Sequence, residues 1–123
     1  MDYFKQPVVE RRDNDDVTVW RLVGDWTRDL PLDVRRAAAD ALKGEATRLV
    51  LDLGDVSFLD SWGEETVCAA LQRVREGGGV VAWRRDAARP SEYAGMARAL
   101  ERRQLHIPGF TDLAAAIAAV KQP

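Results

Sequence analysis

A hydroxyl and two carboxyl groups stand close together in this chain, at Ser61, Asp60 and Glu64. An apolar run over residues 49–53, a turn and a second apolar pair lead directly into them. We expect a helix to begin at Ser61, because a serine followed three residues later by glutamate is the pattern of a capping box. The Ser61 hydroxyl therefore either caps this helix or is displayed for a partner that modifies it.

The spacing by itself favours the cap, since capping boxes are common. The two roles are nevertheless compatible. A phosphate on a serine at a helix N-terminus would meet free backbone amides and the positive end of the helix dipole. The predicted place of Ser61, at the carboxyl edge of a sheet, is also where ligands and partners of α/β folds usually bind.

The neighbours of Ser61 favour different roles. Asp60 is either a turn residue after a strand or a group that orients a hydroxyl or holds Mg²⁺. Glu64 and Glu65 place negative charge in the first helical turn, which suits the helix dipole but opposes a phosphate there. Trp62 is expected to be partly exposed and thus to belong to a contact surface.

A second candidate contact is the segment Asp25, Trp26 and Thr27, which follows a predicted strand that ends at Gly24. A tryptophan in a polar loop is either a binding hot spot or a roof over the core, and the sequence leaves both open for Trp26.

Other reactive residues are few. Cys68 is expected to be inert and His106 structural. The arginines of the C-terminal half are expected to be mainly a solvated surface, with an acidic partner or a phosphate as the lesser alternative; they are Arg84, Arg85, Arg89, Arg98, Arg102 and Arg103. The sequence has no phosphate-binding glycine loop, nucleophile elbow or metal-ligand spacing, so we expect no enzyme and no cofactor.

Composition indicates a soluble globular domain of 123 residues, with 46% hydrophobic and 31% charged residues. The formal net charge of −2 gives no general basic field for nucleic acid. One cysteine and one histidine leave little for a disulfide or a metal site. With no run of 18 apolar residues and no secretory leader, we expect a cytoplasmic protein without membrane insertion.

Hydrophobic periodicity predicts alternating strands and helices. Residues 1–7 are expected to be a polar extension, and residues 8–123 a single domain. Strands are predicted at 8–9, 17–23, 49–53, 80–83 and 105–107, and helices beginning near residues 30, 61, 91 and 111. This order predicts an α/β fold with a small mixed sheet of four to five strands, a possible hairpin at its start and about four helices packed mainly on one face.

The chain resembles the STAS family, which includes the bacterial anti-sigma factor antagonists. The resemblance lies in residues 49–63, in the passage from a helix through Gly77 and Gly78 to the strand that ends at Trp83, and in the turn at Gly24 and Asp25. It covers roughly residues 8–120.

The resemblance implies a regulatory domain rather than an enzyme. In the family, the serine after the aspartate is phosphorylated by a partner that is both a serine kinase and an anti-sigma factor, and the matching serine is Ser61. The unmodified form binds the partner and the phosphorylated form releases it, so that transcription is regulated. The implied contact residues are Asp25, Trp26, Thr27, Asp60, Trp62, Gly63 and Glu64.

The chain departs from the family beside the serine. The family usually has Ser or Thr where this chain has Trp62, and a small or apolar residue and a glycine where it has Glu64 and Glu65. The segment 24–27 also resembles STAS subunits of Mla-type lipid-transport ABC systems, which bind an ATPase without a phosphorylation switch. A third hypothesis, a small enzyme or ligand-binding domain, requires a pocket near Asp52, Asp60 and Ser61.

Overall fold

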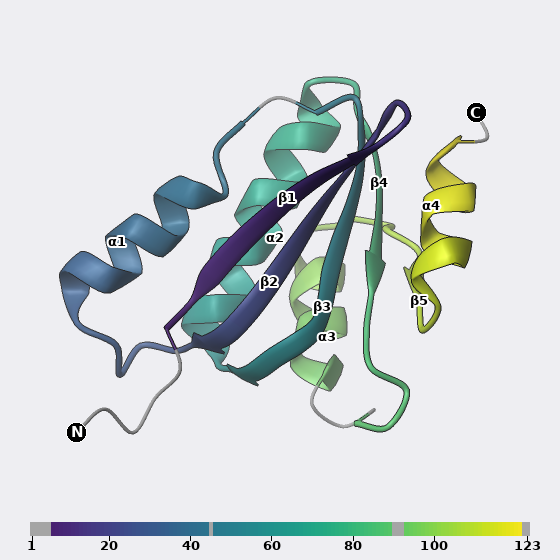
Figure 1. Cartoon of the computed structure of the whole chain (residues 1–123). Coiled ribbons are helices and arrows are strands. Elements are labelled where there is room, and N and C mark those ends of the chain that lie inside the picture. The colour runs from purple at the N-terminus through teal and green to yellow at the C-terminus, as the bar shows by residue number, and fades with distance from the viewer. Residues whose placement is uncertain (1–5, 45, 90–92, 122–123) are drawn as a thin grey trace.

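In a computed structural model, the chain forms one sheet flanked by helices (Figure 1), and the structure describes residues 6–44, 46–89 and 93–121. The elements in chain order are β1 (Val8–Asn14), β2 (Val17–Trp26), α1 (Leu32–Ala41), β3 (Arg48–Leu59), α2 (Ser61–Glu76), β4 (Val80–Arg84), α3 (Ala94–Arg102), β5 (Gly109–Phe110) and α4 (Leu113–Lys121).

The sheet is mixed, as predicted. Its strand order is β1-β2-β3-β4-β5, with β1 antiparallel to β2 and the other pairs parallel. The predicted hairpin joins β1 to β2, and its turn holds Asp15 in the left-handed region at φ 56°. Because three strands run parallel from β2 to β4, their carboxyl ends meet at one end of the sheet, where α1 and α2 begin.

Alternate strand residues face two separate cores. Leu49 and Leu51 belong to the larger core, together with buried residues of α2 and α3. Val50, which lies between them, belongs to a smaller core with Ala116 and Val120 of α4. The helices therefore pack mainly on one face, as predicted, and Figure 1 shows α4 apart from α2 and α3.

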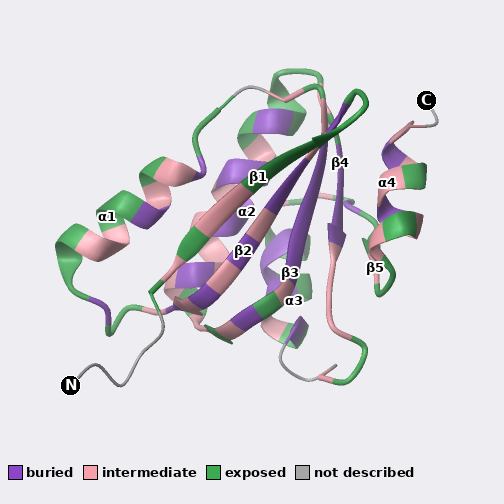
Figure 2. Cartoon of the chain, viewed as in Figure 1, coloured by how far each residue is buried: buried purple, intermediate pink, exposed green. Residues whose placement is uncertain are grey.

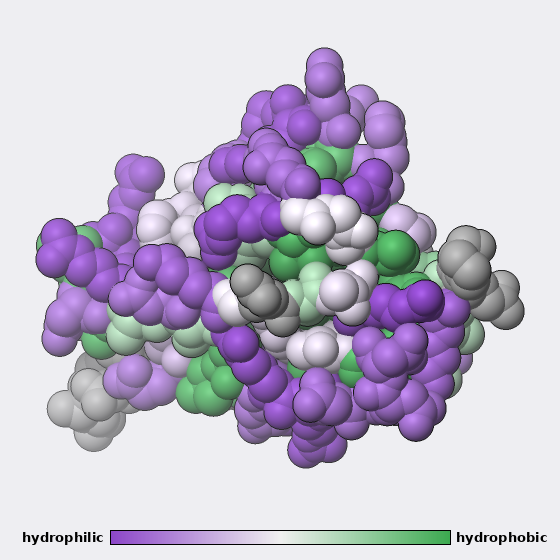
Figure 3. All heavy atoms as spheres, turned by 90° about the horizontal axis from the view of Figure 1, so that it is seen from above, coloured by the Kyte–Doolittle hydropathy of each residue, from purple (hydrophilic) through white to green (hydrophobic). Residues whose placement is uncertain are grey.

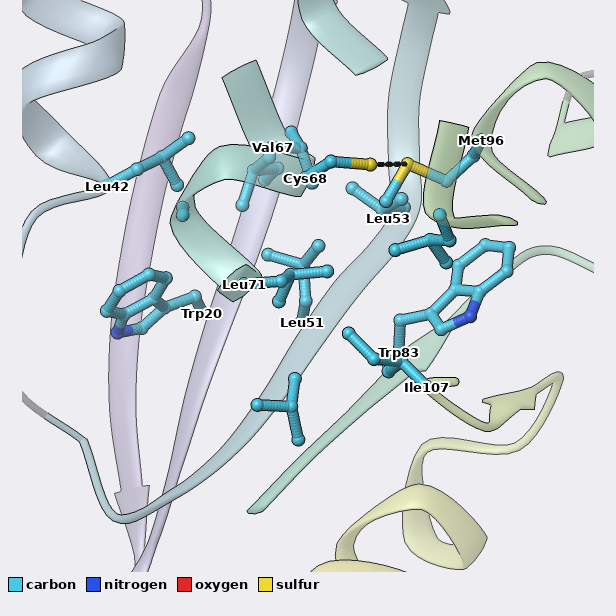
Figure 4. Close-up of a cluster of buried hydrophobic side chains, with 14 of the residues drawn as sticks. Trp20, Leu42, Leu51, Leu53, Val67, Cys68, Leu71, Trp83, Met96 and Ile107 are labelled. Carbon is cyan, nitrogen blue, oxygen red and sulfur yellow. Dashed lines mark hydrogen bonds between the residues drawn. The ribbon is translucent and has the colours of Figure 1, made fainter. Parts of the chain in front are cut away.

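The larger core is built around long side chains that are almost completely buried. Trp20 and Trp26 of β2 contribute the largest of them, and Leu71 of α2 and Met96 of α3 pack in the same cluster. Figure 2 shows that much of β2, β3 and β4 is buried, and Figure 4 shows the cluster between the sheet and the helices. Removing one such side chain from water contributes about 1.5–3 kcal/mol.

β3 is longer than predicted. The turn that we expected after residue 53 is absent, because β3 continues through Gly54 and Asp55 to Leu59. Two bulges in β3 accommodate the extra residues. At the first, β3 advances by three residues while β2 advances by two, from Arg21 to Val23. At the second, β3 advances by two residues while β2 advances by one, from Gly24 to Asp25. Gly24, at φ 91°, likewise lies within β2 and does not end it.

Buried polar contacts hold the first bulge. Asp52, the buried carboxylate of β3, accepts hydrogen bonds from the backbone N–H of Gly54 at 2.9 Å and from Arg84 at 3.1 Å. Arg89 donates to the carbonyl oxygens of Gly54 at 3.2 Å and Val56 at 2.9 Å. These bonds satisfy the polar groups that the bulge removes from the strand ladder.

In the C-terminal half, one predicted strand lies elsewhere and one predicted helix start falls outside the described residues. The terminal strand lies at Gly109–Phe110 rather than at residues 105–107, since Ile107 packs in the core from a loop and the β4 ladder continues through residue 109. The predicted start of the third helix, near residue 91, lies outside the described residues, and the described helix begins at Ala94.

Candidate functional site

The N-cap of α2 is Asp60 and not Ser61. Its backbone is extended, at φ −94° and ψ −173°, and its Oδ1 accepts a hydrogen bond from the N–H of Gly63 at 3.0 Å. The Asp60 carbonyl accepts from the N–H of Glu64 at 2.8 Å. The predicted capping box between Ser61 and Glu64 is therefore wrong, because aspartate is as good an N-cap as serine and here it precedes the helix by one residue.

The second carboxylate oxygen of Asp60 binds the loop after β2. Its Oδ2 accepts from the backbone N–H of Arg28 at 2.7 Å, and the Asp60 N–H donates to the carbonyl of Trp26 at 3.4 Å. Asp60 thus joins two segments that are 32 residues apart in the chain. This arrangement agrees with the role of Asp60 as a turn residue.

Gly63 allows the start of α2 to lie directly against β2. A Cβ atom at this buried position would stand 2.2 Å from the carbonyl oxygen of Trp26 and 2.9 Å from a methyl group of Leu59. Only a residue without a side chain fits such an approach. Gly63 therefore positions the site from within.

The Ser61 hydroxyl is left over once Asp60 and Gly63 have taken these roles. Ser61 is the first residue of α2 and is exposed. Within the described chain, no hydrogen bond or ion pair involves its side chain. The hydroxyl is therefore available to an external group. Helix capping does not account for the serine at this position, because Asp60 caps the helix.

Trp62 lies at the boundary between the core and the surface. It is half-buried and packs against the larger core. The guanidinium carbon of Arg35, on α1, stands 5.8 Å from the centre of the Trp62 ring, and Arg35 Nε donates to the carbonyl of Leu30 at 3.1 Å. This cation–π contact links α1 to the first turn of α2.

Trp26 belongs to the core, and of its two predicted roles the roof over the core is the one that the structure shows. Its side chain is completely buried, and its indole N–H donates to the carbonyl of Val23 at 3.2 Å. The reason is that β2 extends through residue 26, so its alternation continues inward from Trp20 and Leu22. The ring of Trp26 is thus not on the surface, whereas Asp25 and Thr27 are half-buried.

Glu64 and Glu65 are directed toward α3. Glu65 forms ion pairs of 2.9 Å with both Arg102 and Arg103, and their hydrogen bonds lower the pKa of its carboxyl group. Glu64 lies against Gly95, where a Cβ atom would stand 1.8 Å from its Oε2. Burial raises the pKa of Glu64, although the nearby arginines of α3 oppose the shift. The arginines therefore offset much of the acidic charge that we expected beside Ser61.

Sequence reasoning missed Phe58. Its side chain is 65% exposed, although it should face inward like Val56, two residues earlier in the same strand. The second bulge reverses the alternation, because Gly24 pairs with Val56 whereas Asp25 pairs with Phe58. No local sequence signal could have found this, since a bulge depends on how two strands pair.

Two more exposed apolar side chains belong to the same end of the sheet. Leu32, at the start of α1, is 51% exposed, and Val8, at the start of β1, is 45% exposed. Figure 1 shows the starts of β1, α1 and α2 and the end of β3 at this end. We call Val8, Leu32, Phe58 and Ser61 the Ser61 surface.

The other predicted chemistry finds little support in the described residues. No group of three or more histidine, cysteine, aspartate or glutamate side chains among them could hold a metal ion. Asp52 Oδ1 and both carboxylate oxygens of Asp60, which would line a pocket near Ser61, already accept backbone or arginine hydrogen bonds. None of the helices in the described part of the chain is long and apolar enough to cross a membrane.

Comparison with known proteins identifies the fold. No family model matches the sequence, and no curated protein matches it. The structure is similar to that of an anti-sigma factor antagonist from Mycobacterium paratuberculosis, with a TM-score of 0.65, 21% identity and coverage of 94% of this chain and 95% of that one. It is also similar to a protein proposed to be an anti-sigma factor antagonist, from Thermotoga maritima, with a TM-score of 0.62, 17% identity and coverage of 93% and 95%. The predicted fold is thus confirmed: the chain has the STAS-type fold of anti-sigma factor antagonist structures.

Proposed function

We propose that this chain is a non-enzymatic regulatory domain that binds an anti-sigma factor with serine kinase activity, and that Ser61 is its phosphoacceptor. One observation carries the proposal. At the start of α2, the two neighbours Asp60 and Gly63 have structural roles, whereas the Ser61 hydroxyl is exposed and makes no hydrogen bond within the described chain. The STAS-type fold supports the regulatory class.

The Ser61 surface suits a protein partner. Phe58 and Leu32 offer exposed apolar side chains at the same end of the sheet as the Ser61 hydroxyl. Such side chains are the kind of anchor that dominates binding energy at interfaces. The half-buried residues Asp25, Thr27 and Trp62 border this surface. Of the other implied contact residues, Trp26 and Gly63 act by positioning, and Asp60 acts by joining the loop to the helix.

Phosphorylation would act by charge on this surface. A phosphate adds about −1.5 to −2 charges at neutral pH. Ser61 is exposed at the start of α2, and Asp60 already accepts from the N–H of Gly63 there. The phosphate would therefore add its charge at the surface, and burying it under a partner would cost desolvation energy. We expect the phosphorylated form to release the partner.

Capture of the partner, followed by mass spectrometry of the chain, tests whether Ser61 is the phosphoacceptor. Immobilised wild-type protein is exposed to a lysate of its own host, and the captured kinase is purified and incubated with the chain and ATP. Wild type should gain the mass of one phosphate. Ser61→Ala should gain none, and Ser57→Ala, a control at a half-buried serine of β3, should gain as much as wild type.

Two results would contradict the proposal. A kinase that phosphorylates Ser61→Ala as fully as wild type would remove Ser61 as the acceptor. Equal affinity of the partner for the unmodified and phosphorylated forms would remove the charge switch.

A second candidate partner is the ATPase subunit of a Mla-type lipid transporter, without a phosphorylation switch. Trp62 favours it, because this large ring is fixed by Arg35 and the core directly beside the hydroxyl and narrows the approach of a kinase. This candidate would be supported if wild type and Ser61→Ala captured an ATPase subunit equally strongly and captured no kinase. Both proposals place the protein in the cytoplasm.

A further inference from the structure

A groove of about 690 Å³ lies between α3, the end of β4 and the segment 105–109. Its lining includes no residue of α2 or of the segment 24–31, so it is separate from the Ser61 surface. Its floor is formed by three buried side chains, Trp83, Leu100 and Ile107. Figure 4 shows Trp83 and Ile107 side by side at the margin of the core. A groove of this size is in the range of small-molecule sites.

The indole of Trp83 brings a hydrogen-bond donor to the groove. Gly109 of β5 lies close to the nitrogen side of the ring, since a Cβ atom there would stand 3.0 Å from both Nε1 and Cε2. No described residue accepts a hydrogen bond from Trp83 Nε1, and yet this nitrogen is not sealed from solvent as that of Trp20 is. The donor can thus be satisfied from outside.

Arg85 supplies a cation at the edge of the same floor. Its guanidinium carbon stands 5.9 Å from the centre of the Trp83 ring. Its main chain is held at the end of β4, because the backbone N–H of Arg85 donates to the carbonyl of Phe110 at 2.8 Å. The neighbouring Arg84 and Arg89 each have an aspartate partner, but no carboxylate of the described residues forms an ion pair with Arg85.

We propose that this groove binds small amphiphilic monocarboxylates. The apolar part of the ligand lies on Trp83, Leu100 and Leu105, and the carboxylate lies at the guanidinium of Arg85, where the indole N–H is a further donor. One cation matches one negative charge. Glu101 also lines the groove, and its negative charge would oppose a polyanion such as a nucleotide more strongly than a monoanion.

The test uses ¹⁵N-labelled full-length protein and sodium octanoate as the probe, followed by NMR. We expect octanoate to shift the indole N–H signal of Trp83, assigned with Trp83→Phe, and the backbone amides of residues 105–109. A single arginine–carboxylate contact predicts that Arg85→Gln weakens binding by about two- to fivefold. The control Arg36→Gln removes an exposed arginine of α1 and should bind as wild type does.

Octylammonium, which has the same chain and the opposite charge, completes the test. It should bind more weakly than octanoate by a similar factor, since Arg85 would repel it. The proposal is overturned if octanoate shifts none of these signals up to about 10 mM, a concentration that detects even weak ligands. It is also overturned if Arg85→Gln or octylammonium binds with the affinity measured for wild type and octanoate.

Discussion

The two ends of α2 are built in opposite ways. At its start, the backbone at Gly63 touches the carbonyl of Trp26, and the cap residue Asp60 binds a second segment of the chain. At its finish, the turn is local: the N–H of Gly77 donates to the carbonyl of Arg73 at 3.1 Å, and a Cβ atom at Gly78 would meet nothing within 4 Å.

The surfaces around these ends differ as well. Among the described residues, the start of α2 belongs to the end of the sheet that carries three of the four exposed large apolar side chains, and Val80 lies at the other end. In the view of that other end, hydrophilic side chains surround apolar and near-neutral surface in the middle (Figure 3). The closely packed start of α2 is therefore also the end that exposes apolar side chains and the Ser61 hydroxyl.

The largest effect should come from Gly63→Ala. The new methyl group would lie 2.2 Å from the carbonyl oxygen of Trp26, so either α2 or β2 must move. We expect a loss of about 3 kcal/mol or more in the free energy of unfolding, measured with denaturant. The matched change at the other end of the helix, Gly77→Ala, meets its nearest atom at 3.5 Å and should cost much less. Equal losses would show that the two ends are packed alike.

A second effect should appear in binding rather than in stability. Phe58→Ala removes the most exposed large apolar side chain of the Ser61 surface. Because this side chain is the expected interface anchor, its loss should weaken binding of the captured partner by about 2 kcal/mol, or roughly thirtyfold. Its free energy of unfolding should change by less than about 0.5 kcal/mol. Val80→Ala, at the opposite end, should leave the affinity unchanged. If Val80→Ala weakened binding of the partner as much as Phe58→Ala, the partner would not bind specifically at the Ser61 surface.

Loss of the cap should have a smaller effect on stability. Asp60→Ala removes the acceptor for the N–H groups of Gly63 and Arg28, and should cost about 1–2 kcal/mol in the free energy of unfolding. Hydrogen exchange of these two amides should increase together. Asp60→Asn retains one acceptor oxygen and should lose less than Asp60→Ala. An Asp60→Ala protein that protects the Arg28 amide as wild type does would disprove the link between loop and helix.

The smallest effects should come from Glu64 and Glu65, and their signs should be opposite. Because the pKa of Glu65 is lowered in the folded state, its stabilisation is present above the ordinary value of 4.5 and is lost as the pH falls through the lowered value. Because the pKa of Glu64 is raised in the folded state, its ionisation destabilises the fold at pH values above the ordinary pKa of 4.5. Well below pH 4.5 the group is protonated in both states, and this destabilisation disappears.

Urea unfolding of two variants at pH 7 and pH 3 tests these signs. Glu65→Gln should lower the free energy of unfolding at pH 7, and Glu64→Gln should raise it. Both differences should shrink at pH 3, where protonation removes the charges. The same sign for both variants at pH 7 would contradict the different environments of these neighbours.

Most of the architecture could be predicted from the sequence because it rests on local periodicity. The order of strands and helices, the hairpin and the mixed sheet followed from apolar spacing and turn residues. The candidate site was predicted at the start of the second helix, which the structure places at the carboxyl end of the strands. Its details could not be predicted, since Asp60 and Ser61 are equally good caps, and only the position of the Arg28 N–H shows which of them the loop engages.

The sequence by itself determined that an aspartate, a serine and a glycine follow a buried strand and begin an amphipathic helix, because these are contacts between near neighbours. Only the tertiary structure decided which side chains remain available there. The second bulge, set by pairing with β2, turned Phe58 outward, and the continuation of β2 buried Trp26. Arg102 and Arg103, at the end of α3, engaged Glu65. Each of these outcomes joins segments far apart in the chain, which no local pattern of residues encodes.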